Sequence, residues 1–266
     1  MFKHLVTSGC SFSDNDFGMR WPHYLAQELG VKLYNRGQGS AGNDWISMSA
    51  IFQTQKLIES GILPGEICVV VMWSGVNRSG IFINKENPLF SNYISTDVGN
   101  TNPVSFCDTN PNVQQPAKEK GFLLGSPHCT WKNSDITKIK KIYLENFYNE
   151  EWQIISSLQY WLNLQWFCKI QGVKLLNLTY MNIFHHPYGK SHSNKFYETY
   201  PDTTKYLFNM IDLNGWWFDG DNYDGVHEWV KRNGYTLNPG SNLHPSEESY
   251  EKFVKEVLLN RVGELL

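Results

Sequence analysis

Short continuous runs of apolar residues alternate along the chain with apolar residues at helical spacing. The runs predict strands at 3–8, 31–34, 67–73 and 173–178. The helical spacing predicts helices at 21–29, 45–60, 138–172 and 246–264. The run at 67–73 is apolar at every position, which is typical of a strand buried on both faces. Strands that alternate with helices predict an α/β fold whose mainly parallel sheet is covered by helices on both sides.

Polar residues mark where two of these helices start. Asp44 is the expected N-cap of the helix at 45–60. Ser246, with Glu248 close behind it, is the expected start of the last helix.

Two long stretches interrupt the alternation of strands and helices. Residues 78–137 and 180–241 have no sustained apolar period. We interpret them as insertions into one domain that spans 1–266, and the first as a functional insertion or lid. Hydrophobic residues make up 41% of the chain, which supplies enough apolar material for one sizeable core.

Composition and charge exclude several classes of protein. The net charge of −3 excludes a basic nucleic-acid footprint. The five cysteines lie far apart without a C-x-x-C pair, so we expect reduced thiols and no zinc site. No signal-peptide core or membrane-length apolar stretch is present, and we expect a cytoplasmic protein without a membrane partner. No carboxylate pattern frames His185, His186 and His192, so we expect no metal and no cofactor.

Aromatic residues are unusually frequent, at 15% of the chain. Four of them lie shortly before the last helix: Trp216, Trp217, Phe218 and Trp229. They could wall a groove for a sugar ring or an acyl group, or they could anchor long loops to the core. Both interpretations remain open at this point.

Four short motifs occur where the predicted elements end or begin. Ser11 follows the first strand in Gly9-Cys10-Ser11, and a glycine-rich loop at 35–43 follows the second. Asn77 follows the third strand, and His244 precedes the last helix. In parallel sheets the loops beyond the carboxyl ends of the strands meet, so we expect these residues to share one crevice.

Taken singly, each motif has a structural explanation. Ser11 alone is a turn or N-cap serine, and an Asn after a glycine is an ordinary turn residue. The glycines at 37, 39 and 42 lack the acidic partner of a dinucleotide-binding loop.

Taken together and in this order, the four motifs resemble the SGNH (GDSL-like) hydrolase family. The resemblance implies a three-layer α/β/α fold with a mainly parallel, flavodoxin-like sheet and long loop insertions. It implies that Ser11 is the nucleophile and His244 the general base. It also implies an oxyanion hole formed by Asn77 together with a backbone N–H of Gly39 or its neighbour Ser40.

Three positions depart from the pattern of that family. Cys10 stands where the first block usually has Asp, as in a divergent G-C-S-F branch, and Arg78 stands where Asp usually follows Asn77. Ser241 occupies the position of the triad acid, three residues before His244. A serine can orient an imidazole but cannot compensate its charge, so either another carboxylate acts or the site is a Ser-His dyad.

Several carboxylates upstream are candidates for the missing acid. We favour Asp224, with Asp219 and Asp221 as alternatives reached through space. Asp224-Gly225-Val226-His227 also has the D-x-x-H spacing itself. We expect neither the Pro-Ser start nor the apolar helix that follow His244 to come after His227, and therefore favour His244 as the base.

The expected activity is that of a serine esterase acting on a small-molecule or carbohydrate ester, such as an O-acyl or acetyl ester. Acyl transfer to an acceptor other than water would use the same residues. The alternative is a non-catalytic module of the same fold that binds glycans or a protein through its aromatic insertions, which the missing acid favours. The sequence carries no signal for the oligomeric state.

Overall fold

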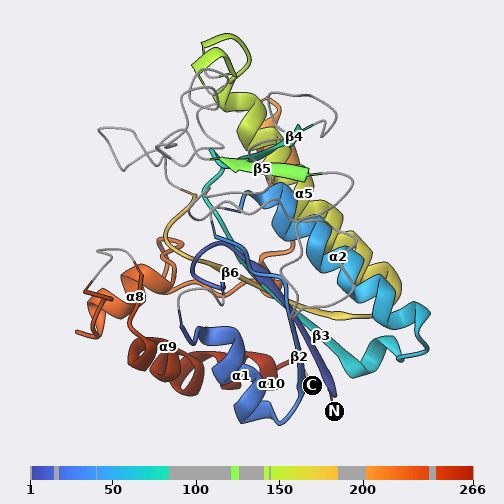
Figure 1. The fold of residues 1–266 in the computed structure, drawn as a ribbon, viewed down its shortest axis with the longest axis vertical. Helices are drawn as coiled ribbons and strands as arrows, with labels where there is room; N and C mark the ends of the chain where they lie inside the picture. Colours follow the sequence, from blue (N-terminus) through green and yellow to red (C-terminus); the bar gives the residue numbers. More distant parts are fainter. Residues whose placement is uncertain are drawn as a thin grey trace.

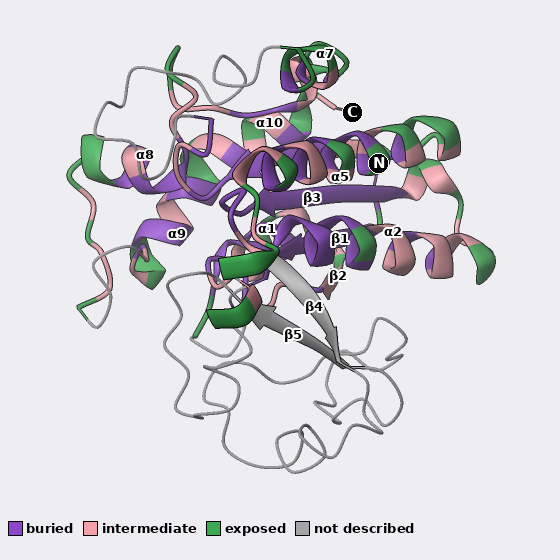
Figure 2. Ribbon diagram, turned by 90° about the horizontal axis from the view of Figure 1, so that it is seen from above, coloured by how far each residue is buried: buried purple, intermediate pink, exposed green. Residues whose placement is uncertain are grey.

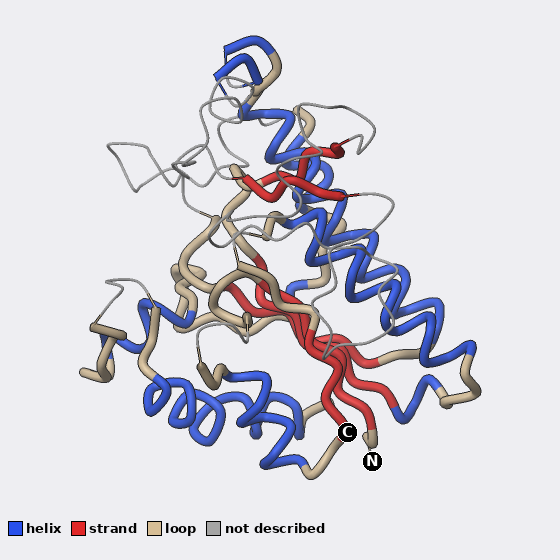
Figure 3. Tube along the Cα trace, in the orientation of Figure 1, coloured by secondary structure: helices blue, strands red, loops and turns tan. Residues whose placement is uncertain are grey.

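A parallel sheet of four strands forms the centre of the molecule (Figure 3). The computed structural model describes residues 2–14, 18–39, 41–83, 121–125, 141–143, 145–184, 202–239 and 244–265. The strands are β1 (His4–Gly9), β2 (Lys32–Asn35), β3 (Ile67–Trp73) and β6 (Lys174–Thr179). Their order is β2-β1-β3-β6, and every neighbouring pair is parallel. The α/β class and the four predicted strands are therefore confirmed.

Helices lie on both sides of this sheet (Figure 1). The longer ones are α1 (Trp21–Leu29), α2 (Asn43–Glu59) and α5 (Glu150–Gln171). The shorter ones are α7 (Thr204–Phe208), α8 (Val226–Arg232), α9 (Glu247–Phe253) and α10 (Leu259–Gly263). Two 3₁₀ turns, η2 (Pro64–Glu66) and η3 (Leu213–Gly215), and a π-helical turn, η4 (Val254–Leu258), are also present, and residues 141–143 and 145–146 are helical.

The helices form two groups, and the helices within each group contact one another. α2 packs on α5, and α1 packs on α9 and α10. In Figure 1 the first pair and the second group lie on opposite sides of the strands. Among the described residues, no helix combines the length and apolar character that crossing a bilayer requires.

One predicted helix is interrupted, and the predicted start of another is wrong. Within the stretch predicted as helical at 138–172, residues 141–143 and 145–146 are helical, and α5 begins at Glu150 after a break, where the Asn149 side chain caps it by accepting a hydrogen bond from the Trp152 N–H. α2 begins at Asn43 with Gly42 as its N-cap. Asp44 lies inside the first turn, where its carboxylate accepts a hydrogen bond from the Trp45 N–H. Its negative charge there interacts favourably with the positive end of the helix dipole. The start at Ser246 is confirmed, because its hydroxyl accepts from the Ser249 N–H.

The two insertions contain regular structure that the sequence did not predict. β4 (Ser79–Ile83) and β5 (Gly121–Gly125) form an antiparallel pair. Each has only three consecutive apolar residues, too few for a detectable period, and the partners are far apart in the chain. α7 and α8 likewise lie within the stretch at 180–241 that we expected to be irregular.

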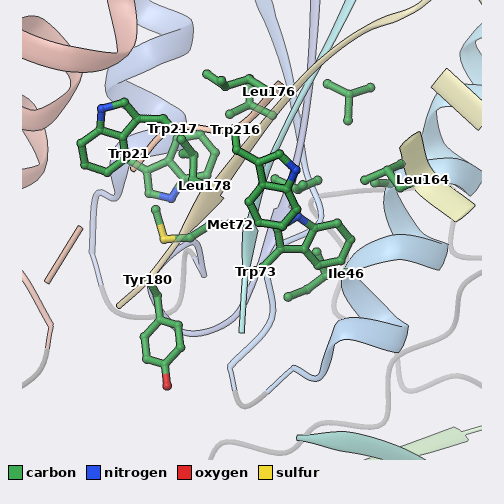
Figure 4. Close-up of a cluster of buried hydrophobic side chains, with 14 of the residues drawn as sticks. Trp21, Ile46, Met72, Trp73, Leu164, Leu176, Leu178, Tyr180, Trp216 and Trp217 are labelled. Atoms are coloured by element: carbon green, nitrogen blue, oxygen red, sulfur yellow. The ribbon is translucent and has the colours of Figure 1, made fainter. Parts of the chain in front are cut away.

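β3 is buried along its whole length, as its apolar run predicts (Figure 2). Its last two residues point to opposite faces of the sheet. In Figure 4, Met72 lies on the side of Trp21 and Trp217, and Trp73 lies on the side of Trp216 and Ile46. The Trp73 indole N–H donates to the Asn177 side-chain oxygen on β6 at 2.9 Å, which satisfies its polar atom inside the core.

The aromatic residues before the last helix belong to the core. Trp216 stacks on Trp73 with ring centroids 6.3 Å apart, and Phe218 stacks on Trp216. On the other face, Trp217 and Trp229 pack against Phe253 of α9. The interpretation in which these rings anchor a long segment to the core is confirmed, because Trp216, Trp217 and Trp229 are buried in it.

Trp161 of α5 contacts three aromatic rings of this core, those of Trp73, Phe184 and Trp216. We expect Trp161→Ala to lower the free energy of unfolding by about 3–5 kcal/mol, because it removes a large buried side chain and leaves a cavity. Trp166→Ala on the same helix, whose ring is 42% exposed, is the matched control and should cost under about 1 kcal/mol. Urea unfolding of both variants measures the difference, and equal losses would contradict this account of the core.

Candidate active site

Ser11 and His244 are in direct contact although 233 residues separate them in the chain. The distance from Ser11 Oγ to His244 Nε2 is 2.7 Å, which is hydrogen-bonding distance for a hydroxyl and an imidazole nitrogen. Ser11 lies in the loop that leaves β1, where the Ser13 N–H donates to the Cys10 carbonyl and closes a turn. The structure therefore brings together the predicted nucleophile and the predicted base.

His244 is held by backbone pairing with the segment before it. Its carbonyl accepts from the Asn238 N–H at 2.8 Å, and the Ser246 N–H donates to the Thr236 carbonyl at 3.0 Å. Pro245 is buried and bridges to Leu237. These hydrogen bonds fix the backbone at His244 and Ser246, and α9 starts directly after them. The imidazole therefore extends from a backbone with a fixed position.

Aromatic packing connects this pair to the end of β3. The Phe12 ring lies 4.5 Å from the His244 ring and 5.1 Å from the Tyr180 ring, measured between centroids. A Cβ at Gly75 would lie 2.8 Å from the Asn77 side-chain oxygen and 3.4 Å from the Tyr180 hydroxyl. Asn77 is buried, at 6% exposed, and two rings, those of Tyr180 and Phe12, connect this predicted oxyanion donor to His244.

Gly39 also lies in this neighbourhood, but its N–H has a partner. It donates to the Asp14 carboxylate at 2.6 Å, a short, charge-assisted hydrogen bond. This N–H could bind an oxyanion only after the bond to Asp14 breaks, which leaves Asn77 and the Ser11 backbone N–H as the candidate donors. Ser40, the alternative donor, lies outside the described residues.

Close backbone contact explains the glycines in the loop after β2. A Cβ at Gly37 would overlap the Ser13 carbonyl oxygen, and one at Gly42 would lie 2.6 Å from the Arg78 carbonyl oxygen. The Asn35 side chain reinforces the first contact, because its amide donates to the Ser13 carbonyl at 2.7 Å. The loop is thus pressed against the loops after β1 and β3, a role more specific than that of a flexible turn.

The surroundings of His244 disfavour its charged form. Burial lowers the pKa of the imidazole most, and the positive charges of Arg20, Arg78 and His227 lower it further, to about 4. The ring is therefore neutral at physiological pH and able to accept a proton from Ser11.

Asp224, the favoured candidate for the triad acid, has other contacts. Its carboxylate pairs with Arg232 at 2.5 Å and accepts from the Asn182 amide at 3.2 Å. Asp219 pairs with the same guanidinium at 2.9 Å, and Asp221 is exposed. These contacts give Asp224 and Asp219 a structural role, because they join the turn before α8 to Arg232, the last residue of that helix. Ser241 lies outside the described residues.

His227 lies near the site without taking the place of His244. Its backbone N–H donates to the Tyr180 carbonyl at 2.9 Å, and the residue contributes to the lowered pKa of His244. A Cβ at Gly225 would lie 2.5 Å from the Thr179 carbonyl oxygen, so this segment is pressed against the end of β6. Contrary to expectation, the segment does lead into a helix, α8, because the Glu228 carboxylate accepts from the Gly225 N–H.

Metal-binding residues are not gathered in the part of the chain that the structure describes. Within those ranges, no three His, Cys, Asp or Glu side chains lie close enough together to hold a metal ion. Cys10, Cys68 and Cys168 are free, buried thiols. His185, His186 and His192 lie outside the described residues.

Sequence reasoning missed three residues that shape the site: Asp14, Tyr180 and Arg20. Asp14 follows Ser11 closely in a polar turn, so its position was a signal that could have been used. Tyr180 and Arg20 belong to no motif, and only the fold brings them near His244.

We expect Gly37→Ala to destabilise the protein by about 1–3 kcal/mol, because the added methyl group overlaps the Ser13 backbone. Moving Ser13 also moves Ser11, so the nitrogen resonances of the His244 imidazole should shift in the NMR spectrum. Gly65→Ala is the control, since nothing lies within 4 Å of a Cβ there, and it should change stability by under about 0.5 kcal/mol. Equal unfolding free energies and an unchanged imidazole would show that the loop tolerates a side chain.

No protein-family model matches the chain, and no curated protein is similar to it in sequence. The resemblance to SGNH hydrolases consequently consists of the four short motifs and their order. The contact between Ser11 and His244 is independent of that resemblance, since it follows from the fold of this chain.

Proposed function

We propose that the protein is a serine hydrolase of the SGNH (GDSL-like) type that cleaves an ester, with a small molecule or a carbohydrate O-acyl or acetyl ester as its substrate. The observation that carries the proposal is the 2.7 Å contact between Ser11 Oγ and His244 Nε2. A hydroxyl and a neutral imidazole at this distance are the two groups that nucleophilic ester cleavage needs.

The proposed reaction has two halves. In the first, His244 Nε2 takes the Ser11 proton while Oγ attacks the ester carbonyl, and the resulting oxyanion is stabilised by Asn77 and the Ser11 N–H. His244 then gives the proton to the leaving alcohol as the C–O bond breaks, which leaves an acyl-serine. In the second half, a water molecule loses its proton to His244 and releases the acid, and the proton returns to Ser11.

Strand order supports the finer description of the fold as three-layered and flavodoxin-like. Counted among themselves, the four parallel strands have the order 2-1-3-4, which matches the first four positions of the flavodoxin-like order. Trp216 forms a parallel bridge to Asn177 of β6, on the side where a fifth strand would add. The helices on opposite sides of the strands in Figure 1 agree with two outer layers.

We expect a fluorophosphonate probe to label Ser11, and Ser11→Ala to lose both labelling and hydrolysis of p-nitrophenyl esters. Ser60→Ala, at the far end of α2, is the control that should retain both. Peptide sequencing of the adduct identifies the labelled serine. Esterase activity retained in Ser11→Ala would disprove the proposal, and a folded wild type without labelling or turnover that binds oligosaccharides would favour the non-catalytic alternative.

The pH dependence of hydrolysis should reflect the lowered pKa of His244. Only the neutral imidazole accepts the serine proton, so kcat/KM falls as the pH drops through the imidazole pKa. With a pKa of about 4, activity should persist well below pH 6.5, the midpoint of an unperturbed histidine. Arg78→Gln removes one positive charge and should raise the midpoint. A wild-type midpoint at 6.5, measured in brief assays that avoid acid unfolding, would contradict this environment for His244.

A further inference from the structure

Arg20 is a buried arginine close to the candidate site. It is 2% exposed and occupies the N-cap position of α1. Its guanidinium lies over the Tyr250 ring of α9, with the Cζ atom 5.4 Å from the ring centroid. The next residue, Trp21, donates from its indole N–H to Ser13 Oγ at 3.0 Å, which joins α1 to the loop that carries Ser11.

The Arg20 guanidinium has no ionic partner within the described ranges. Its Nε and Nη1 atoms are shielded from solvent and make no hydrogen bond there. Glu247, in the first turn of α9, instead accepts from the Met19 N–H at 3.0 Å. Buried arginines are almost always paired, because removing the charge from water is costly. Contact with the Tyr250 ring offsets only part of that cost.

The positive charge of Arg20 acts on the reacting residues. It is the largest electrostatic influence on the His244 imidazole, ahead of those of Arg78 and His227. Arg78 lies over the Tyr180 ring, on the Asn77 side of the site. A substrate at Ser11 therefore enters surroundings with two guanidinium groups.

We propose that the substrate carries an oxyanion group, most simply a carboxylate, next to its ester bond, and that Arg20 is the residue that binds this group. The inference rests on the proposed function, because it assigns a substrate class to the same site. The planar guanidinium offers N–H groups in the geometry that a carboxylate or phosphate accepts. Binding would satisfy the donors that are unsatisfied in the free protein.

An anionic substrate would also assist the chemical step. His244 becomes an imidazolium when it takes the Ser11 proton, and the neighbouring guanidinium groups oppose that charge. An anion paired with Arg20 neutralises part of the repulsion. It thereby favours the transition state in the way that the acid of a catalytic triad does.

The test compares esters that differ only in charge. On the acyl side, the pair is mono-4-nitrophenyl succinate and its neutral primary amide, 4-nitrophenyl succinamate. On the alcohol side, the pair is 4-acetoxybenzoate and 4-acetoxybenzamide. We expect the wild type to cleave the anionic member of at least one pair with a kcat/KM at least about tenfold higher, because a desolvated charge pair forms only with that member.

Variants at position 20 assign the preference to Arg20. Arg20→Gln should abolish it, so that the two members of each pair are cleaved with the same kcat/KM, and Arg20→Lys should keep part of it because the charge remains. Arg261→Gln, which removes an arginine paired with Glu264 on α10, is the control and should leave the preference unchanged. Circular dichroism checks that each variant folds.

A binding arm separates this inference from the proposed function. Calorimetry on Ser11→Ala measures the binding of two ligands: the mono-4-nitroanilide of succinic acid, which is anionic, and the same anilide with its carboxylate replaced by a neutral primary amide. Binding of either ligand does not depend on hydrolysis. Ester cleavage without a charge preference, or a preference that survives in Arg20→Gln, overturns the anion site and leaves the hydrolase intact. Arg20-dependent binding of the anionic anilide without any ester cleavage supports the anion site and rejects the hydrolase. If the protein neither binds the anionic anilide nor cleaves the esters, both the anion site and the hydrolase are rejected.

Discussion

Parallel pairing of β1 with both β2 and β3 is the constraint on which the candidate site depends. Gly9, the last residue of β1, pairs with Met72 near the end of β3. β2 pairs with β1 on its other side and runs in the same direction. The loops that leave the three strands therefore start at the same edge of the sheet. Since α9 packs on α1, the residue that precedes α9 is delivered to this edge as well, and Ser11 meets His244 there.

Close backbone contact then converts nearby loops into a fixed arrangement. Gly37, Gly42 and Gly225 each lie where a Cβ would clash with the backbone of a neighbouring loop. The Asp14 carboxylate and the Asn35 amide supply the hydrogen bonds between these loops. These contacts fix the loop of Ser11 beyond the end of β1, where the strands alone no longer position it.

The sequence predicted the parts of this structure that local patterns control. Each main strand is a compact apolar run, so the strand ends that carry Ser11 and Asn77 could be located, and Ser246 marked the start of α9 after His244. β4 and β5 could not, since each is short and its partner is remote. The hydrogen bond from Gly39 to Asp14 and the burial of Arg20 against Tyr250 arise only from tertiary packing, which no local period records.

Burial of Arg20 also bears on why the site departs from the pattern of SGNH hydrolases. A triad acid placed beside His244 would raise the imidazole pKa, whereas the described residues whose charge acts on the ring, Arg20, Arg78 and His227, lower it. Arg78 stands where that family usually has an acidic residue after its Asn, which increases the imbalance in the same direction. A site that accumulates positive charge around a neutral base is matched to a reactant that brings negative charge with it. The departure at Arg78 and the buried Arg20 thus both fit the proposed anionic substrate, whose charge would complete the electrostatics of the site.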